Sequence, residues 1–270
     1  MFGRQLPEQR RPELSQHFLR KGALAASLVL HTSISNQDLV LEIGPGYGAL
    51  TRALASRCRR LIAVEVDASL IGALRAEFGD IPNVQLIHGD FLQTALPASA
   101  FKVFANLPFS QTAAIVRRLL DASVQPDDAY LIMQQQAAER FAGHPYAPET
   151  LQSLRLKPWW HVEILRRLRR TDFAPPPRVE CVLLWLARRP RPLVDQSEGS
   201  LYRNFVTAAF GRTGKTMTQC LRQLLTDRQI ARLAYDLGFD PTGSPSSLSF
   251  DQWLGVFRFS VMTASSRKKG

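Results

Sequence analysis

Residues 41–50, LEIGPGYGAL, place three glycines between an apolar run and the start of a helical pattern. Gly44, Gly46 and Gly48 lack a Cβ, so they permit positive φ angles and let a ligand approach the backbone closely. A glycine loop that follows a strand and opens a helix is typical of nucleotide-binding α/β proteins. With Ala49 the loop also satisfies the dinucleotide pattern G-x-G-x-x-A, and a loop that binds no ligand is a further alternative.

Short apolar runs alternate with helical patterns on both sides of this loop. The runs predicted to be buried strands are residues 39–43, 61–65, 84–88, 101–105 and 129–133. Apolar residues recur at helical spacing in residues 49–57, 68–78 and 110–121. Alternation of this kind predicts an α/β fold, a Rossmann-like parallel sheet with helices on both faces.

The chain changes character after the predicted sheet. Residues 189–198 are rich in proline and charge, which indicates a linker. The pattern beyond the linker is helical, and Thr226 and Gly238 are suitable start and stop residues for one of its helices. We expect a small all-α domain at 199–264 and a basic tail at 265–270.

An excess of positive charge indicates a polyanionic partner. The 270 residues include 34 Lys and Arg against 23 Asp and Glu, a net charge of +11. Residues 155–191 alone hold ten basic and three acidic residues. A nucleic acid is the simplest partner for such a stretch, and a solvated basic face is the alternative.

Composition excludes several classes of protein. Cys58, Cys181 and Cys220 form no Cys-x-x-Cys, and no His pair has ligand spacing, so neither a metal site nor a disulfide framework is expected. No apolar run approaches the roughly 18 residues that cross a membrane. The charged N-terminus lacks the apolar region of a signal peptide, which predicts a cytoplasmic protein. Nothing indicates an obligate dimer, so we expect a monomer.

Two carboxylates follow neighbouring strands of the predicted sheet. Glu65 ends the second strand, where a carboxylate can accept hydrogen bonds from both hydroxyls of a ribose, as in NAD enzymes. Asp90 follows the third strand and can accept a hydrogen bond from an adenine amino group, whereas capping of a Gly-Asp turn is the alternative. Because both lie at the same sheet edge as the glycine loop, the sequence predicts an adenosine-containing ligand.

Residues 106–109, NLPF, follow the fourth predicted strand. Pro108 biases Leu107 toward an extended shape, which directs the Asn106 side-chain oxygen and the Leu107 carbonyl toward one point. Two such acceptors suit a planar NH2 group, and Phe109 offers a face for a stacked ring. The absence of a strong base or nucleophile fits transfer to a weakly nucleophilic amine. An N-capped helix start with a core phenylalanine is the alternative.

Several segments together resemble the rRNA adenine-N6 methyltransferases. NLPF is similar to that family's Asn-[Leu/Ile]-Pro-[Tyr/Phe] signature, and LSQHFL (14–19) to its Gln-Asn-Phe-Leu motif. LEIGPGYGALT, AVEVD, HGDFL and FAPPPRVECVLL (173–184) resemble further motifs of the family. The segment GFDPTGSPSSLSFDQWLGVFRF (238–259) is similar to the end of Erm proteins, the macrolide-resistance enzymes that act on 23S rRNA. The resemblance implies the class I methyltransferase form of the sheet and S-adenosylmethionine as methyl donor.

The resemblance also implies roles for individual residues, with 1–38 as a basic, donor-contacting arm, 39–188 as the catalytic domain and 199–264 as an RNA-binding domain. Donor contacts fall on Gln16, His17, Leu19, Gly44, Gly46, Glu65, Val66, Asp90, Phe91 and Asn106. The catalytic positions are Asn106 and Leu107, which bind the target amine, and Phe109 and Phe173, which sandwich the extruded adenine. RNA contacts fall on Arg140, Arg166, Arg167, Arg169 and Arg170. Two departures are His17, where many members have Asn, and MQQQAAER (133–140), where a Gln-Lys-Glu run is commoner.

The expected function is N6-methylation, once or twice, of one adenine in 23S rRNA, as protein-free or precursor RNA, with macrolide resistance as the result. A small-subunit 16S rRNA adenine dimethyltransferase and a non-catalytic RNA-binding protein of the same fold are the alternatives. An NAD dehydrogenase fits less well, because no catalytic His, Lys or Tyr constellation is evident. A zinc deaminase is excluded by the missing Cys-x-x-Cys.

Overall fold

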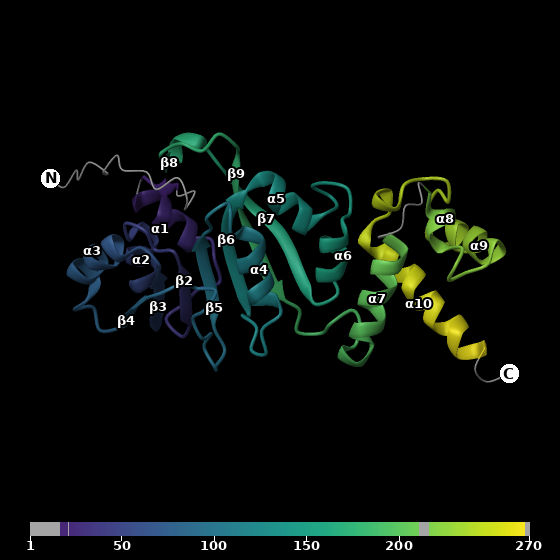
Figure 1. Cartoon of the computed structure of the whole chain (residues 1–270), viewed down its shortest axis with the longest axis horizontal. Coiled ribbons are helices and arrows are strands. Elements are labelled where there is room, and N and C mark those ends of the chain that lie inside the picture. The colour runs from purple at the N-terminus through teal and green to yellow at the C-terminus, as the bar shows by residue number, and fades with distance from the viewer. Residues whose placement is uncertain (1–16, 21, 211–215, 268–270) are drawn as a thin grey trace. The chain divides into compact units, whose positions relative to one another are not determined.

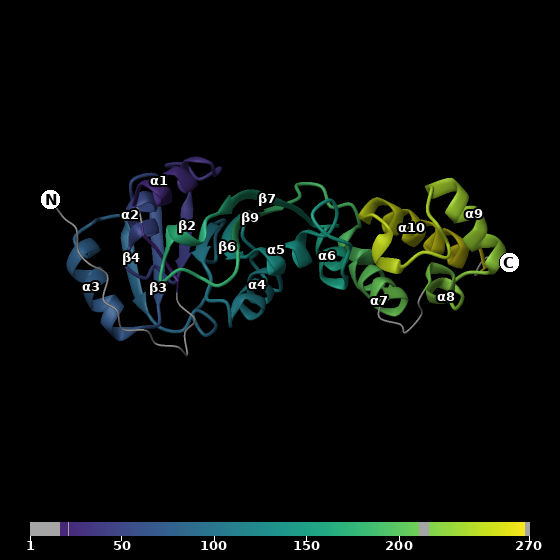
Figure 2. The same ribbon diagram turned by 90° about the horizontal axis from the view of Figure 1, so that it is seen from above.

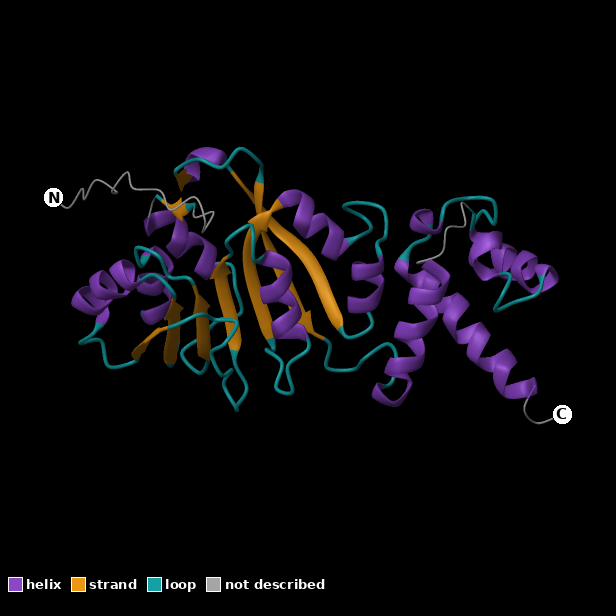
Figure 3. Cartoon of the chain, in the orientation of Figure 1, coloured by secondary structure: helices purple, strands orange, loops and turns teal. Residues whose placement is uncertain are grey.

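The computed structural model describes residues 17–20, 22–210 and 216–267, which form two compact units. Figures 1 and 3 show the helices and strands of both units. Unit 1 holds the described residues up to Ala138 together with Glu163–Arg188. Unit 2 holds Glu139–Val162 and the described residues from Arg189 onward.

The main sheet has the strand order β4-β3-β2-β5-β6-β9-β7 in the described chain. Its strands are β2 (Leu39–Ile43), β3 (Arg60–Glu65), β4 (Val84–His88), β5 (Lys102–Asn106), β6 (Asp128–Gln134), β7 (Trp160–Leu168) and β9 (Cys181–Arg188). Strands β2 to β6 pair in parallel, and β9 pairs antiparallel to β6. The carboxyl ends of β2, β3 and β5 therefore meet at one edge.

The predicted strands and the predicted fold class are confirmed. All five residues of β2 are buried, as expected for a strand covered on both faces of a parallel sheet. The predicted strands 39–43 and 84–88 match β2 and β4 residue for residue, and the other three differ from β3, β5 and β6 by one residue at one or both ends. Apolar runs bounded by turns thus determine the sheet.

Helices cover both faces of this sheet, as Figure 2 shows for α1 (Gly22–Leu30) and α2 (Ala49–Ala55) on one side and α4 (Thr112–Leu120) on the other. The face of the sheet under α1 and α2 buries an apolar cluster that includes Leu28, Leu54, Val40, Phe104 and Tyr130. Helix α3 (Ala68–Phe78) packs against Val84 and Leu86 of β4 through an apolar cluster. The cluster consists of Ile71, Leu74 and Phe78. Because helices cover both faces of the sheet, the candidate functional residues lie at the ends of its strands.

A second, two-stranded sheet lies beside the strand ends. It consists of β1 (Phe18–Leu19) and β8 (Phe173–Ala174), which pair antiparallel. Arg20 N donates a hydrogen bond to Asp172 O at 2.9 Å, at the end of the 3-10 turn η2 (Arg170–Asp172). Strand β1, ahead of α1, is therefore hydrogen-bonded to β8, a segment more than 150 residues away in sequence.

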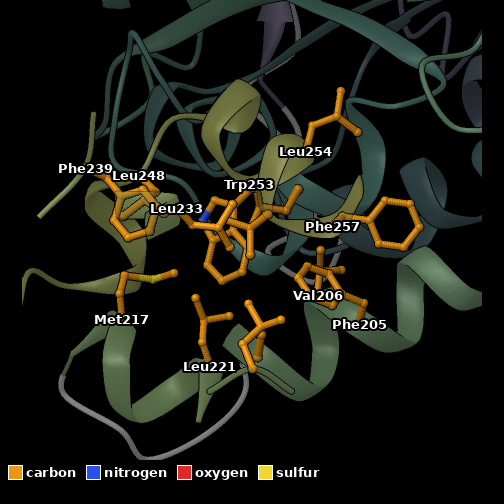
Figure 4. Close-up of a cluster of buried hydrophobic side chains, with 14 of the residues drawn as sticks. Phe205, Val206, Met217, Leu221, Leu233, Phe239, Leu248, Trp253, Leu254 and Phe257 are labelled. Atoms are coloured by element: carbon orange, nitrogen blue, oxygen red, sulfur yellow. The ribbon is translucent and has the colours of Figure 1, made fainter. Parts of the chain in front are cut away.

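Unit 2 has its own helical core. Its helices are α6 (Leu151–Leu156), α7 (Gly199–Phe210), α8 (Met217–Leu221), α9 (Asp227–Leu237) and α10 (Phe250–Arg267), with 3-10 turns η3 (Gln196–Glu198) and η4 (Pro245–Ser247). Figure 4 shows Trp253, fully buried, among Phe205, Val206, Leu221 and Leu233. The predicted ends of α9 are confirmed, because Thr226 caps its start and Gly238 closes it with φ 67°.

The two units differ from the predicted domains at residues 139–162 and at the C-terminal end of α10. Residues 139–162 precede the predicted linker, yet they pack with the C-terminal helices. Leu154 belongs to the helical core, and its carbonyl accepts a hydrogen bond from Tyr202 Oη at 2.9 Å. The helix α5 (Gln135–Ala142) runs across the boundary. A further difference is that α10 extends into the predicted basic tail, as far as Arg267.

Two predicted absences concern membranes and metals. Among the helices of the described chain, none combines the length and hydropathy that a membrane crossing requires. Within the same residues, no three His, Cys, Asp or Glu side chains are grouped as metal ligands. Cys58, Cys181 and Cys220 are each buried as free thiols.

Candidate active site

The glycine loop turns sharply at the end of β2. Gly44, Gly46 and Gly48 all have positive φ angles, of 67°, 59° and 80°. Each position is therefore strained for any residue with a Cβ. A Cβ on Gly44 would meet no atom within 4 Å, whereas a Cβ on Gly46 would lie 2.6 Å from the ring of Phe18. The loop is thus open on the side of Gly44 and closed by Phe18 on the side of Gly46.

Glu65 anchors this loop from the end of β3. Its Oε2 accepts a hydrogen bond from Gly46 N at 3.1 Å, and its Oε1 accepts one from Asp67 N at 3.0 Å. Burial raises the pKa of this carboxyl, and the backbone donors partly offset the effect. Each carboxylate oxygen has a second lone-pair site, so the anchored group can still accept the hydroxyls of a ribose.

The residues next to Glu65 that are predicted to contact the methyl donor differ in exposure. Val66, directly after β3, is 48% exposed, whereas Phe91 is 5% exposed. Asp90 is half-buried, and its Oδ1 accepts a hydrogen bond from Leu92 N at 2.8 Å. The turn-capping interpretation of Asp90 therefore applies to Oδ1, and Oδ2 has no hydrogen-bond partner among the described residues. The predicted adenine contact is compatible with that free oxygen and stays a prediction.

Asn106 ends β5 with its side chain held in one orientation. Its Nδ2 donates a hydrogen bond to the carbonyl of His17 at 2.6 Å. A carbonyl can only accept, so the contact fixes which amide atom is nitrogen and leaves Oδ1 as an acceptor. Leu107 N donates to Ile132 O at 2.9 Å, which fixes the next peptide. No described residue donates to Asn106 Oδ1 or to the Leu107 carbonyl, so both acceptors predicted from the sequence are available.

Phe109 carries an aromatic neighbour that the sequence did not indicate. Its ring centroid lies 5.0 Å from that of His17, with an interplanar angle of 33°. The ring of His17 also donates a hydrogen bond from Nδ1 to Pro175 O at 2.8 Å. Both side chains are half-buried. The predicted contact of His17 with the methyl donor stays a prediction.

Two predicted residues have their side chains in the core instead. Phe173 is 1% exposed and Leu19 is 7% exposed, and both belong to the cluster beneath α1. The two residues face each other as a pair of the β1–β8 sheet. The ring of Phe173 thus has no open face for an adenine in this structure, and the predicted sandwich is left with Phe109. Gln16 lies outside the described residues.

One buried acid at this site was not singled out from the sequence. Glu42 lies on β2 with 0% exposure, and neither of its carboxyl oxygens has a hydrogen-bond partner among the described residues. Burial, together with the nearby charge of Glu65, raises its pKa to about 8. The available signal was an acid inside the otherwise apolar run LVLEI.

The predicted RNA-binding arginines are all exposed side chains. Arg166 and Arg167 lie on β7, Arg169 and Arg170 follow that strand, and Arg140 lies on α5. Three of the four in unit 1 make a polar contact with a neighbour, Arg166 with Ser27 Oγ, Arg169 with Asp172 and Arg170 with Pro177 O. Arg140 belongs to the other unit. Their binding to RNA stays a prediction.

Comparison with known proteins identifies the family of this chain. The family model for ribosomal RNA adenine dimethylase matches residues 8–259. The chain belongs to the ribosomal RNA adenine dimethylase family. It is an S-adenosylmethionine-dependent enzyme that methylates adenine in ribosomal RNA, as the resemblance implied.

Individual relatives fall into two groups. Ribosomal RNA small subunit methyltransferase A of Clostridium perfringens strain SM101 is 30% identical over 247 residues, which cover 89% of this chain and 87% of the relative. An rRNA adenine N-6-methyltransferase of Streptomyces fradiae is 32% identical over 250 residues, covering 92% and 78%.

Two solved structures share the fold of this chain. The 23S rRNA methyltransferase ErmE has a TM-score of 0.83 at 26% identity, covering 89% of this chain and 98% of ErmE. A dimethyladenosine transferase from Plasmodium falciparum has a TM-score of 0.70 at 19% identity, covering 91% and 98%, and shows the fold.

The residues present fit the methyl donor that the family uses. The open side of Gly44 leaves room where a Cβ would otherwise stand. Glu65 presents two carboxylate oxygens, Val66 an exposed apolar side chain and Asp90 a free oxygen along the same edge. When bound, the donor supplies an electrophilic methyl group on a sulfonium.

Proposed function

We propose that this protein methylates the N6 amine of one adenine in 23S rRNA and thereby confers resistance to macrolide-type antibiotics. The single observation that carries the choice of amine is the pair of unpartnered acceptors at Asn106 Oδ1 and the Leu107 carbonyl. The choice of 23S rRNA is supported by the likeness to ErmE at TM-score 0.83. The arginines of β7 and of the turn after it supply positive charge for RNA phosphates.

The two acceptors address the main chemical obstacle of the reaction. The lone pair of an adenine amino group is delocalised into the ring, so this nitrogen is a poor nucleophile. Hydrogen bonds from its two N–H groups to Asn106 and Leu107 favour a more tetrahedral nitrogen and stabilise positive charge that develops on it. Both acceptors are held by backbone contacts, at His17 and Ile132, so little reorganisation accompanies the reaction. The proton leaves to solvent, and no base is required of the protein.

The target adenine must leave its stack before it can reach Asn106. Extrusion costs a few kcal/mol, and stacking on an aromatic side chain returns about 1–3 kcal/mol. Phe109 is half-buried beside the two acceptors, so it is the ring available for this purpose. Stacking there would hold the amine in the plane that the two acceptors define.

Transfer of a labelled methyl group tests the proposal. Protein-free 23S and 16S rRNA are incubated separately with labelled S-adenosylmethionine, and the modified base is mapped by primer extension. We expect label in 23S rRNA at one adenine, and expression in a macrolide-sensitive bacterium should raise the inhibitory concentration. Asn106→Ala is the matched control for both readouts. Label in 16S rRNA alone would reject the proposed substrate.

A second candidate is dimethylation of adenine in small-subunit rRNA. It is favoured by the relatives named ribosomal RNA small subunit methyltransferase A, which include a Synechococcus elongatus protein 32% identical over 261 residues. The same site chemistry serves either RNA, because the acceptors read only the amine. The two candidates therefore differ in RNA binding, and the paired rRNA assay separates them.

A further inference from the structure

The turn that carries Asp90 is closed by hydrogen bonds of its own. Asp90 Oδ1 accepts from Leu92 N at 2.8 Å, and the carbonyl of Asp90 accepts from Thr94 N at 3.0 Å and from Thr94 Oγ1 at 2.8 Å. Thr94 N also donates to Phe91 O at 3.2 Å. All these bonds lie within residues 90–94, so they fix the shape of the turn but not its position on the protein.

Arg118 connects this turn to helix α4. Its Nη2 donates a hydrogen bond to the carbonyl of Thr94. Its guanidinium also lies over the ring of Phe91, with Cζ 5.7 Å from the ring centroid. Phe91 is 5% exposed, so its ring is an internal surface of the turn. One side chain of α4 therefore contacts both the first half and the end of the turn.

The guanidinium of Arg118 has few polar partners for a half-buried cation. Its Nε is buried and has no hydrogen-bond partner among the described residues, and none of their carboxylates forms an ion pair with it. A cation withdrawn from water requires compensation. The face of an aromatic ring carries negative charge and attracts a cation within about 6 Å, so Phe91 supplies part of that compensation. The charge of Arg118 is thus directed at the turn.

We propose that Arg118 is a positioning residue for recognition of the methyl donor. It holds residues 90–94 at the place where Asp90 Oδ2 accepts a hydrogen bond from the amino group of the donor's adenine. The inference rests on the proposed function only through the predicted contact between Asp90 and that amino group. It does not depend on which rRNA is methylated.

Selectivity for the amino group depends on the exact position of Asp90. A charged acceptor held at hydrogen-bond distance prefers a ligand that carries the N–H, because its absence leaves the acceptor unpaired. A hydrogen bond weakens steeply with distance and angle, so a displaced turn loses this preference. The anchoring of Glu65 to Gly46 N does not involve Arg118, so binding of the ribose should persist.

Calorimetry without RNA tests the proposal on two ligands. These are S-adenosylhomocysteine, the donor without its methyl group, and a 6-deamino analogue with hydrogen in place of the adenine amino group. Wild type should bind the analogue about ten-fold more weakly, and Asp90→Ala should abolish this preference. Arg118→Met should weaken binding of S-adenosylhomocysteine about five-fold and of the analogue less than about two-fold. Arg117→Met, at an exposed neighbour on α4, is the matched control and should keep the wild-type preference.

Two further variants complete the test. Arg118→Lys keeps a positive charge for Phe91 and a donor for Thr94 O, so it should retain at least about a five-fold preference. Arg118→Gln replaces the methionine variant if that protein does not fold, and it should lose the preference in the same way.

Three results would overturn the proposal. They are an unchanged preference in the uncharged variants, equal weakening of both ligands, and a lysine variant that behaves as methionine. A wild-type protein without any preference would overturn the Asp90 contact and the proposal together. Failure of the proposed 23S substrate would appear only in the rRNA assay, and it would leave these ligand affinities as they are.

Discussion

Removal of the ionisable group at Glu42 should change how stability depends on pH. Glu42 is fully buried without a hydrogen-bond partner in the described chain, and burial raises its pKa from 4.5 to about 8. In the unfolded chain the same group ionises near its ordinary value. Between these two values the folded protein holds a proton that the unfolded chain has lost, so stability falls as pH rises, by about 1.4 kcal/mol per pH unit. The full effect is present below the lower value and is lost once pH passes the higher one.

Glu42→Gln abolishes this titration, although its buried amide carries a cost that does not depend on pH. We expect the free energy of unfolding of Glu42→Gln, relative to wild type, to rise by about 3–4 kcal/mol between about pH 5 and about pH 8. Urea unfolding of both proteins across that range measures the difference, because every other titrating group is shared. Glu42→Leu replaces the glutamine variant if the amide prevents folding. Parallel pH profiles would mean that Glu42 is solvated or ionised in the folded protein, which refutes the reasoning.

Three further substitutions test the rest of the site. Asn106→Ala should lower kcat about 100-fold, measured by transfer of a labelled methyl group. The dissociation constant for the methyl donor, measured by calorimetry, should stay within about three-fold of wild type. An unchanged kcat would contradict the role assigned to Asn106. Glu65→Ala should weaken the affinity for the methyl donor about ten-fold or more, as measured by calorimetry. The substitution removes a charged acceptor and the hydrogen bond that Glu65 accepts from the glycine loop. An unchanged affinity would contradict this prediction. Gly46→Ala should lower stability by about 1–3 kcal/mol, because its Cβ meets Phe18 at a positive φ. Gly22→Ala, where a Cβ meets nothing within 4 Å, is the matched control, and equal melting temperatures for the two variants would contradict the clash.

The sheet could be predicted from the sequence because its strands are locally determined. Residues 39–43 and 84–88 are short apolar runs between turn signals, and the structure begins and ends both strands at the predicted residues. The positions of the glycine loop, Glu65 and Asn106 could be predicted for the same reason, since each lies at or directly after the end of a strand of this sheet. In a parallel sheet, position along the chain then determines position at the carboxyl edge.

Contacts between distant segments could not be predicted in this way. The burial of Phe173 results from its pairing with Leu19, and no local pattern of FAPPP indicates that partner. The packing of residues 139–162 with the C-terminal helices has the same origin, since Leu154 and Tyr202 are 48 residues apart. Sequence periodicity indicates that a side chain is buried but does not indicate its partner.

The orientation of Asn106 depends on such a distant contact. The sequence places this amide at the end of β5, but an amide there could present either its oxygen or its nitrogen to the target amine. The carbonyl of His17 decides between them, because it accepts only from Nδ2 and so leaves Oδ1 free to accept. Since that acceptor is a main-chain atom, a side-chain substitution at 17 leaves it in place as long as β1 stays paired with β8. The pairing of β1 with β8, rather than the identity of residue 17, therefore keeps Oδ1 of Asn106 available as an acceptor.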